Sequence, residues 1–203
     1  MSDHYFTIPD QASAEIKVKG SRFIANVIPT DSPDAVDSAL TRIRKQYYDA
    51  THNCYAWQTG RDNDISFKYS DDGEPSGTAG KPIYDCIVGR TLTDLLLVVT
   101  RYFGGTKLGT GGLVRAYSDA AVAALEAAGR VERFVTTRLT IEIDFTFFDA
   151  IRKLIAELDA AEVDADYSDR VRLTLEIRES MLPKLRAALI EKTNGRVAFV
   201  ETT

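Results

Sequence analysis

The sequence predicts an α+β protein that folds as two domains. A continuous apolar run, Leu95–Val99, has the pattern of a strand buried on both faces, and residues at helical spacing follow it. From residue 139 onward, strand and helix patterns follow one another in the order β-α-β-β-α-β. A chain of 203 residues is long enough to bury two separate cores. We therefore expect one domain over residues 1–132 and a second over residues 133–203.

The first domain should begin with two short strands and a helix. Ile16 and Val18, and then the apolar positions from Phe23 to Ile28, suggest two strands joined at Gly20. Ser32-Pro33 marks a helix start, because serine can cap a helix and proline fits its first position. The apolar face of this helix recurs every three or four residues, at Val36, Leu40, Ile43 and Tyr47.

Two further strands, Cys54–Gln58 and Ile65–Tyr69, are expected on either side of Gly60, followed by a loop and a short helix over Pro82–Gly89. Aromatic residues alternate along these two strands and could stack bases on an open sheet face. Large rings more often belong to a core, because they bury the most area. We expect a core position for at least half of the four: Tyr55, Trp57, Phe67 and Tyr69.

The stretch from Arg101 to Tyr117 organises the first domain. Its five glycines are expected in the turn between the apolar strand and the next helix, which Gly129 should end. Backbone N–H groups at such a turn stay unpaired, and no acidic residue lies between Asp94 and Asp119, so the stretch suits an anion. The spacing fits neither a Walker loop nor a dinucleotide fingerprint. The alternative is that the glycines only permit a tight turn and close packing.

The predicted anion or nucleic-acid site combines this turn with nearby cations. We expect Arg101, Lys107 and Arg115 to converge there, although Arg101 and Arg115 could instead pair with an internal acid such as Asp119 or Asp72. Lys81, at the end of the loop that starts at Asp71, could line the same pocket. The predicted site residues are Arg101, Gly104, Gly105, Lys107, Gly109, Thr110, Gly111, Gly112, Arg115 and Lys81.

A possible secondary site consists of His52, Asn53, Asp72 and Glu74. His52 and Cys54 share one strand face, but a structural cysteine beside a hydrogen-bonded histidine is the favoured interpretation, because nothing in the sequence activates the thiol. The acidic pair Asp71-Asp72 and Glu74 could hold magnesium, yet ordinary turn chemistry accounts for these residues and no further ligand can be identified. We expect no metal and no cofactor.

The second domain has the element order of a ferredoxin-like sandwich. Its strands alternate apolar and polar residues, and its helices carry one apolar face. The expected elements are, in order, a strand from Leu139 to Phe147, a helix over Ile151–Leu158, strands over Val163–Tyr167 and Val171–Ile177, a helix over Leu182–Leu189 and a strand over Val197–Val200.

Four blocks carry a resemblance to a known family: Ser21–Ile24, His52–Trp57, Asp71–Ile83 and Arg101–Tyr117. In these blocks, and in their order, the chain resembles the bacterial two-domain type of the IMPACT/YigZ family (uncharacterised protein family 29). The resemblance is dense from residue 15 to about residue 128. It implies a first domain like the second domain of ribosomal protein S5 and a ferredoxin-like second domain. Together, and in this order, the two implied domains are similar to the last two domains of elongation factor G.

Composition limits the functions that this resemblance allows. The net charge of −5 weighs against a general nucleic-acid binder, so any anion-binding surface must be a local patch. No apolar segment has transmembrane length, and no membrane association is expected. The only two cysteines, Cys54 and Cys86, form no Cys-x-x-Cys motif, which is typical of reduced thiols in the cytosol.

The resemblance implies a cytosolic accessory or regulatory factor of translation that binds RNA, the ribosome or a protein partner, rather than a catalyst. Eukaryotic relatives modulate the general amino-acid-control response through a protein partner, but their companion domain differs, so that partner does not carry over. Two alternatives stay open, namely an enzyme acting on a nucleotide or phosphorylated small molecule, and a purely protein-binding module. The sequence leaves the oligomeric state open.

Overall fold

The computed structural model describes residues 3 to 200, which form two compact units. One unit is Tyr5–Arg133, and the other holds the described residues from Phe134 onward together with Asp3 and His4. The predicted fold class, α+β in two domains, is confirmed. Among the described residues, no helix is long and apolar enough to cross a membrane.

The first unit is built on a five-stranded antiparallel sheet in the order β2-β3-β6-β4-β5. Its elements are, in chain order, β2 (Ala12–Val18), β3 (Ser21–Pro29), α1 (Pro33–Gln46), β4 (His52–Thr59), the 3₁₀ helix η1 (Asp62–Asp64), β5 (Ser66–Ser70), α2 (Gly80–Gly89), β6 (Leu95–Tyr102) and α3 (Gly109–Ala128). A separate two-stranded sheet pairs β1 (His4–Thr7) with β7 (Val131–Phe134).

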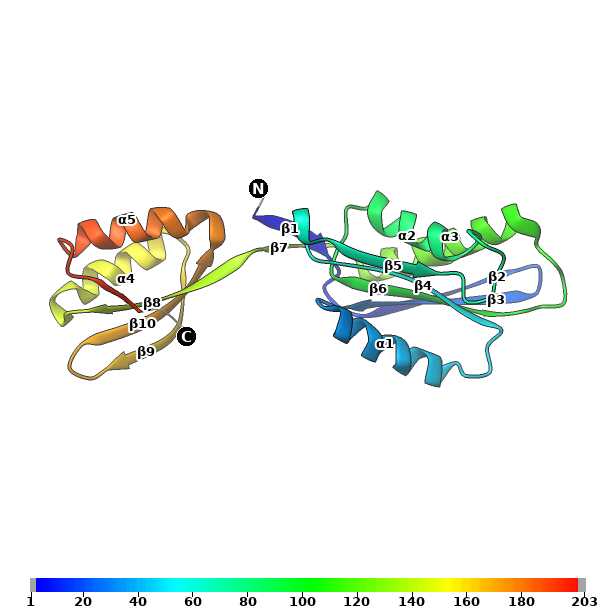
Figure 1. Cartoon of the computed structure of the whole chain (residues 1–203), viewed down its shortest axis with the longest axis horizontal. Coiled ribbons are helices and arrows are strands. Elements are labelled where there is room, and N and C mark those ends of the chain that lie inside the picture. The colour runs from blue at the N-terminus through cyan, green and yellow to red at the C-terminus, as the bar shows by residue number, and fades with distance from the viewer. Residues whose placement is uncertain (1–2, 201–203) are drawn as a thin grey trace. The chain divides into compact units, whose positions relative to one another are not determined.

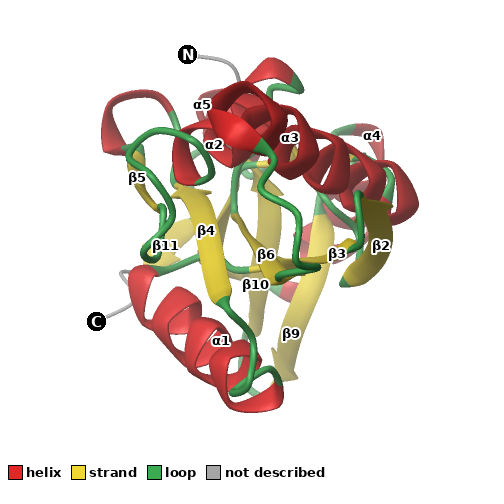
Figure 2. Ribbon diagram, turned by 90° about the vertical axis from the view of Figure 1, so that its right-hand side faces the viewer, coloured by secondary structure: helices red, strands yellow, loops and turns green. Residues whose placement is uncertain are grey.

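Helices cover both faces of the five-stranded sheet. Helix α1 lies on one face, and α2 and α3 lie on the other (Figures 1 and 2). The central strand β6 contributes to both cores: Leu97 and Val99 pack on the α2–α3 side, whereas Leu96 and Val98 pack on the α1 side. The apolar run was predicted to be a strand buried on both faces, and the structure confirms this.

Local signals in the sequence set several element boundaries. The hydroxyl of Ser32 accepts a hydrogen bond from the backbone N–H of Ala35, so α1 begins with the expected cap. Helix α3 ends at Gly129, whose positive φ of 75° is easy for glycine. Two of the four alternating aromatic residues, Tyr55 and Trp57, are buried, as expected for at least half of them.

The glycine-rich stretch differs from the expectation in one respect. Only Gly104 and Gly105 lie in the turn, because α3 already begins at Gly109 and includes Gly111 and Gly112. Leu113 is buried against the sheet, and a helical side chain packs over the turn that precedes it. Burial of Leu113 therefore orders the glycines before it into the first helical turn.

The second unit is the ferredoxin-like sandwich that the sequence predicted. Its four-stranded sheet has the order β11-β8-β10-β9 with antiparallel neighbours, and one core joins the sheet to both helices. The elements are β8 (Thr136–Ile143), η2 (Phe145–Phe147), α4 (Phe148–Glu157), β9 (Ala161–Tyr167), β10 (Val171–Arg178), η3 (Glu179–Met181), α5 (Leu182–Lys192) and β11 (Ala198–Val200).

Two glycines allow the β2–β3 turn to touch the loop after β6. A Cβ atom added to Gly104 would lie only 1.9 Å from the carbonyl carbon of Gly20, so no side chain fits there. The backbone N–H of Gly104 also donates to the hydroxyl of Ser21, over 3.1 Å. This close approach brings Lys19, which precedes Gly20 in the turn, next to the glycine-rich loop.

Alanine substitutions at Gly104 and Gly111 should have different effects on stability, because the first disturbs close packing and the second affects only helix propensity. We expect Gly104→Ala to destabilise the first unit, because the two backbones must move apart. Overpacking of this kind costs about 1–3 kcal/mol or more. Gly111→Ala meets nothing within 4 Å and should be neutral or stabilise by up to about 1 kcal/mol. Urea unfolding of both variants checks this, and equal midpoints would contradict it.

Candidate functional site

A cavity of about 390 Å³ opens where β6, the loop after it, the start of α3 and the loop from Asp71 to Ala79 meet. Its size lies within the range of small-molecule sites. It combines an ion pair, an exposed aromatic ring, one lysine and the first turn of a helix. The residues that line it are Glu74, Pro75, Arg101, Phe103, Lys107, Leu108, Gly109, Thr110 and Leu113.

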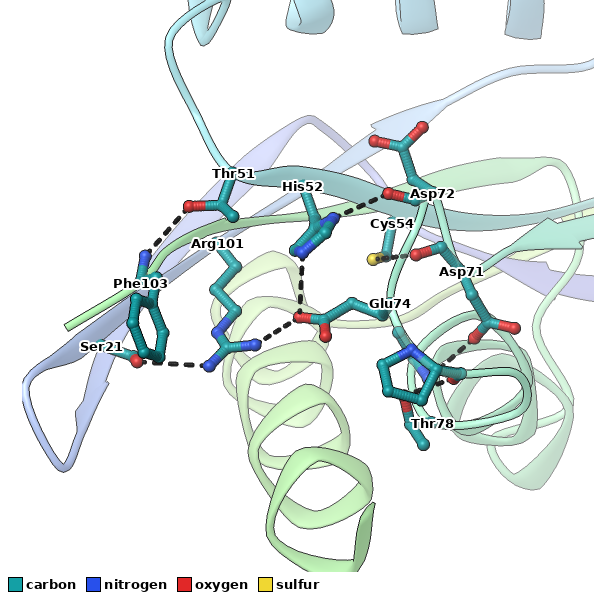
Figure 3. Close-up of polar contacts among 12 residues, drawn as sticks. Ser21, Thr51, His52, Cys54, Asp71, Asp72, Glu74, Thr78, Arg101 and Phe103 are labelled. Atoms are coloured by element: carbon teal, nitrogen blue, oxygen red, sulfur yellow. Dashed lines mark hydrogen bonds and ion pairs between the residues drawn. The ribbon is translucent and has the colours of Figure 1, made fainter. Parts of the chain in front are cut away.

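Strand register places Arg101 at the floor of this cavity. Arg101 on β6 lies between Phe23 of β3 and His52 of β4. Its side chain is only 6% exposed, and its Nη1 donates to Oε1 of Glu74 over 2.6 Å (Figure 3). Two interpretations were open from the sequence: a cation available to an anion, or a cation paired with an internal acid such as Asp72 or Asp119. The structure pairs Arg101 with an internal acid, which is Glu74, so its charge is largely neutralised.

Glu74 is the junction of the polar network. Its Oε1 also accepts a hydrogen bond from the hydroxyl of Tyr117 over 2.8 Å, and Nε2 of His52 lies 3.9 Å from the same oxygen. Its second oxygen, Oε2, has no hydrogen-bond partner among the described residues. The loop that carries Glu74 is therefore tied to β6, α3 and β4 through a single carboxylate.

His52 and Cys54 are held by backbone carbonyls of the acidic loop. Nδ1 of His52 lies 2.8 Å from the carbonyl oxygen of Asp72, which only accepts, so Nδ1 carries the proton. The thiol of Cys54 donates to the carbonyl of Asp71 over 2.9 Å. Burial raises the pKa of Cys54 to about 12, so the residue is a thiol at neutral pH and no nucleophile.

Asp71 and Asp72, the other two acidic residues of the loop, stabilise its conformation through hydrogen bonds. Burial opposes ionisation of Asp71, but hydrogen bonds from the backbone N–H groups of Gly77, Gly80 and Ala79 outweigh it and hold its pKa below the ordinary value. These bonds also cap the start of α2. Asp72 accepts from the backbone N–H of Asn53 over 2.7 Å. Within residues 3–200, no group of three or more His, Cys, Asp or Glu side chains is placed to hold a metal ion.

Helix α3 begins at the cavity without a side-chain cap. Leu108 precedes it and makes no capping hydrogen bond, in contrast to Ser32 before α1. The first N–H groups of the helix, from Gly109 to Gly111, therefore keep their hydrogen-bonding capacity and the positive end of the dipole. A Cβ added to Gly109 or Gly111 would meet nothing within 4 Å, so the space above them is open.

Two of the predicted cations do not line this cavity. Arg115 is exposed on α3 but follows Leu113 by two residues, about 200° around the helix, and so faces away from the side that Leu113 takes. Lys81 lines a different hollow beside α2 and forms an ion pair with Asp85. Lys107 alone of the three exposed predicted cations lines the cavity.

Sequence reasoning missed the apolar lining of the cavity. Phe103 is 48% exposed, and Pro75, Leu108 and Leu113 complete the apolar surface. Phe103 was a possible signal, because a large apolar residue directly before a glycine pair in a loop has little core to join. The position of Lys19 beside Gly104 depends on the contact between two turns and had no local signal.

Removing the carboxylate of Glu74 should destabilise the first unit strongly. Glu74→Ala leaves Arg101 buried without its counter-ion, and breaking a buried pair costs about 3–5 kcal/mol. Glu15→Ala is the matched control, because Glu15 pairs with Arg22 on the surface, and we expect little change. Urea denaturation measures both; a similar small loss for the two variants would show that the buried pair is not a structural tie.

The thiol of Cys54 should make the unfolding free energy depend on alkaline pH. Its folded pKa, about 12, lies above the ordinary value of 9.0, so the folded chain holds the proton more tightly than the unfolded chain. This stability is complete below pH 9.0 and is lost toward pH 12, at up to about 1.4 kcal/mol per pH unit. In urea titrations above pH 9.0, the unfolding free energy of Cys54→Ala should therefore decrease less steeply with pH than that of the parent. Parallel declines of parent and variant would contradict this.

Comparison with known proteins agrees with the two-unit structure. The Impact N-terminal domain family matches residues 19–125, and a domain of unknown function (DUF1949) matches residues 141–196. The IMPACT family member YvyE of Bacillus subtilis (strain 168) is 36% identical over 97% of this chain and 90% of its own length. YigZ of Escherichia coli (strain K12) is 33% identical over 91% of each chain.

A solved structure described as a hypothetical protein superposes with a TM-score of 0.70, at 29% identity, over 100% of this chain and 99% of its own. Both family matches fall in the order of the two units, and the relatives align over nearly the full chain. The chain therefore belongs to the IMPACT family.

Proposed function

We propose that this protein is a cytosolic accessory factor of translation whose first unit binds single-stranded RNA at the cavity between β6 and α3. One observation carries the proposal: an exposed ring, a lysine and an uncapped helix start share one cavity. Single-stranded nucleic acid is bound by this combination of an aromatic stacking surface and local positive charge. The role in translation rests on the family resemblance.

The mouth of the cavity suits a phosphate group. The N–H groups of Gly109 and Thr110 come from the positive end of α3, and Lys107 precedes them by only two residues. Lys19 in the neighbouring turn adds a second exposed cation to this end of the sheet. The chain carries a net charge of −5, so this patch is a local exception to its overall charge.

The walls of the cavity suit a nucleobase. Phe103 is about half exposed, and Pro75 and Leu113 offer further apolar contacts. Stacking of a base on an aromatic side chain contributes about 1–3 kcal/mol and tolerates different bases. A base stacked on Phe103 would lie between the ion pair at the floor and the phosphate contacts at the mouth.

The outer face of the second unit is unsuited to RNA. Ferredoxin-like sheets that bind RNA present aromatic residues on their two central strands. Here the central strands β8 and β10 place opposite charges across from each other, Arg138 with Glu176 and Glu142 with Arg172. Thr140 and Thr174 lie between these pairs and contact each other. On the two central strands the outward-facing opposite charges are thus paired with each other, which favours the first unit as the RNA-binding part.

A catalytic alternative has less support. An enzyme acting on a nucleotide would need an activated nucleophile or base near the cavity. The thiol of Cys54 is kept protonated, and its hydrogen bonds go to Asp71 and Tyr117. One oxygen of Glu74 is engaged by Arg101 and Tyr117, which ties the carboxylate to the fold. We therefore favour binding over catalysis.

Salt-dependent binding to RNA tests the proposal. A fluorescent single-stranded uridine-rich oligomer should bind the full chain, with affinity that falls as salt rises from about 50 to 200 mM. Lys107→Ala should weaken binding and lower the slope of log affinity against log salt by about 0.7, the value for one phosphate contact on a single strand.

Lys45→Ala is the matched control for this experiment. Lys45 is an exposed lysine of the same unit, on α1, which covers the opposite face of the sheet. Its loss should leave both the affinity and the salt slope close to those of the parent. Absence of binding to any single strand, or equal effects of the two lysine variants, would refute the proposed site.

A further inference from the structure

We infer that the cavity selects guanine: the base enters with its Watson–Crick edge toward Glu74 and Arg101, and its phosphate stays at the mouth near Lys107. This inference rests on the proposed RNA-binding function and adds the identity of the bound nucleotide. The arrangement of donors and acceptors at the floor of the cavity supports it.

The floor offers one carboxylate oxygen that the protein leaves unused. Oε1 of Glu74 already accepts from Arg101 and Tyr117, whereas Oε2 has no partner among the described residues. Glu74 lines the cavity, so a group that approaches its carboxylate must donate a hydrogen bond. Phosphates and carbonyl oxygens are repelled from this oxygen. The charged end of a nucleotide is thereby directed outward.

Beside this acceptor, Arg101 offers donors. Its Nη1 and Nη2 donate to Glu74 and Ser21, and each of these nitrogens carries a second N–H. Its Nε is buried and cannot contact a ligand in the cavity. A guanidinium carries five N–H groups, so further donors remain on the side chain. The floor therefore presents an acceptor on Glu74 next to a donor surface on Arg101, both held in place by their mutual ion pair.

Guanine fits this pattern better than the other three bases. Its edge presents the carbonyl O6, the N1–H donor and the N2 amino donor side by side. O6 can accept from Arg101 while N1–H and the amino group donate to Oε2 of Glu74. Adenine and cytosine offer one amino group next to an unprotonated ring nitrogen, and uracil offers one N–H between two carbonyls. In each of these bases an acceptor would face the carboxylate.

The mouth and the walls are consistent with this orientation. A phosphate can reach Lys107 and the N–H groups at Gly109 and Thr110, and the base can stack on Phe103. The volume of about 390 Å³ is near the lower end for small-molecule sites, which matches one nucleotide rather than several.

Four RNA hexamers that differ at a single base test the inference. Uridine hexamers with one internal guanosine, 1-methylguanosine, inosine or adenosine are titrated into the full chain by fluorescence anisotropy. The guanosine hexamer should bind about tenfold or more tightly than the 1-methylguanosine and adenosine hexamers, because a well-placed base contact gives this discrimination. Inosine, which lacks only the N2 amino group, should lie between them.

Two variants assign the selectivity to this cavity. Lys107→Ala should weaken the binding of all four hexamers by the same factor, because it removes only a phosphate contact. The ratios between their affinities should therefore stay unchanged. Glu74→Gln, if circular dichroism shows it folded, should reduce the ratio of guanosine to 1-methylguanosine toward one. If it does not fold, the hexamer series with the parent protein still decides.

The outcomes separate this inference from the proposed function. Equal binding of all four hexamers, with Lys107→Ala still weaker, would overturn guanine selection and leave RNA binding in place. Tighter binding of adenosine than guanosine would also overturn it. If none of the hexamers binds, both the selectivity and the proposed function fail.

Discussion

The buried pair between Glu74 and Arg101 is the contact on which the cavity depends. It joins a loop with little regular structure to the central strand of the sheet, and the hydroxyl of Tyr117 ties the same carboxylate to α3. Such a pair contributes little to net stability, because both charges lose hydration, but it fixes geometry firmly. The loop from Asp71 to Ala79 is thereby tied to β6 and α3, and through Glu74 and Pro75 it forms one wall of the cavity.

Hydrogen bonds from backbone N–H groups to Asp71 and Asp72 fix the same loop in addition to that ion pair. The carboxylate of Asp71 accepts hydrogen bonds from three backbone N–H groups around the start of α2. The carboxylate of Asp72 accepts from the backbone N–H of Asn53 on β4. The α-helices α1, α2 and α3 therefore begin in three different ways. A local serine caps α1, a distant aspartate caps α2, and the start of α3 is uncapped at the cavity. An uncapped start is tolerable where water or a ligand can reach the N–H groups.

Elements governed by local chemistry could be predicted from the sequence, whereas contacts between distant segments could not. The cap at Ser32 and the stop at Gly129 each depend on a few neighbouring residues, and both appear in the structure. The alternating pattern predicted a strand from Leu139 to Phe147, but β8 ends at Ile143 and Phe145–Phe147 forms the 3₁₀ helix η2. The partner of Arg101 depends on how the loop folds back over strand β6. Both Asp72 and Asp119 were reasonable candidates by sequence, and Glu74 was not separable from them. Of the predicted anion site, Arg101, Lys107, Gly109 and Thr110 line one cavity, while Arg115 and Lys81 lie elsewhere.

The double-sided burial of β6 gives the first unit two cores that are separated by the sheet. The core beneath α1 shares no residue with the core beneath α2 and α3. Ser38, near the middle of α1, is exposed and takes part in neither. For an experimenter, the α1 side is thus a convenient place for a fluorophore, an affinity tag or attachment to a surface. A label introduced there is separated from the cavity by a whole layer of strands, and it can report on binding without occupying the site.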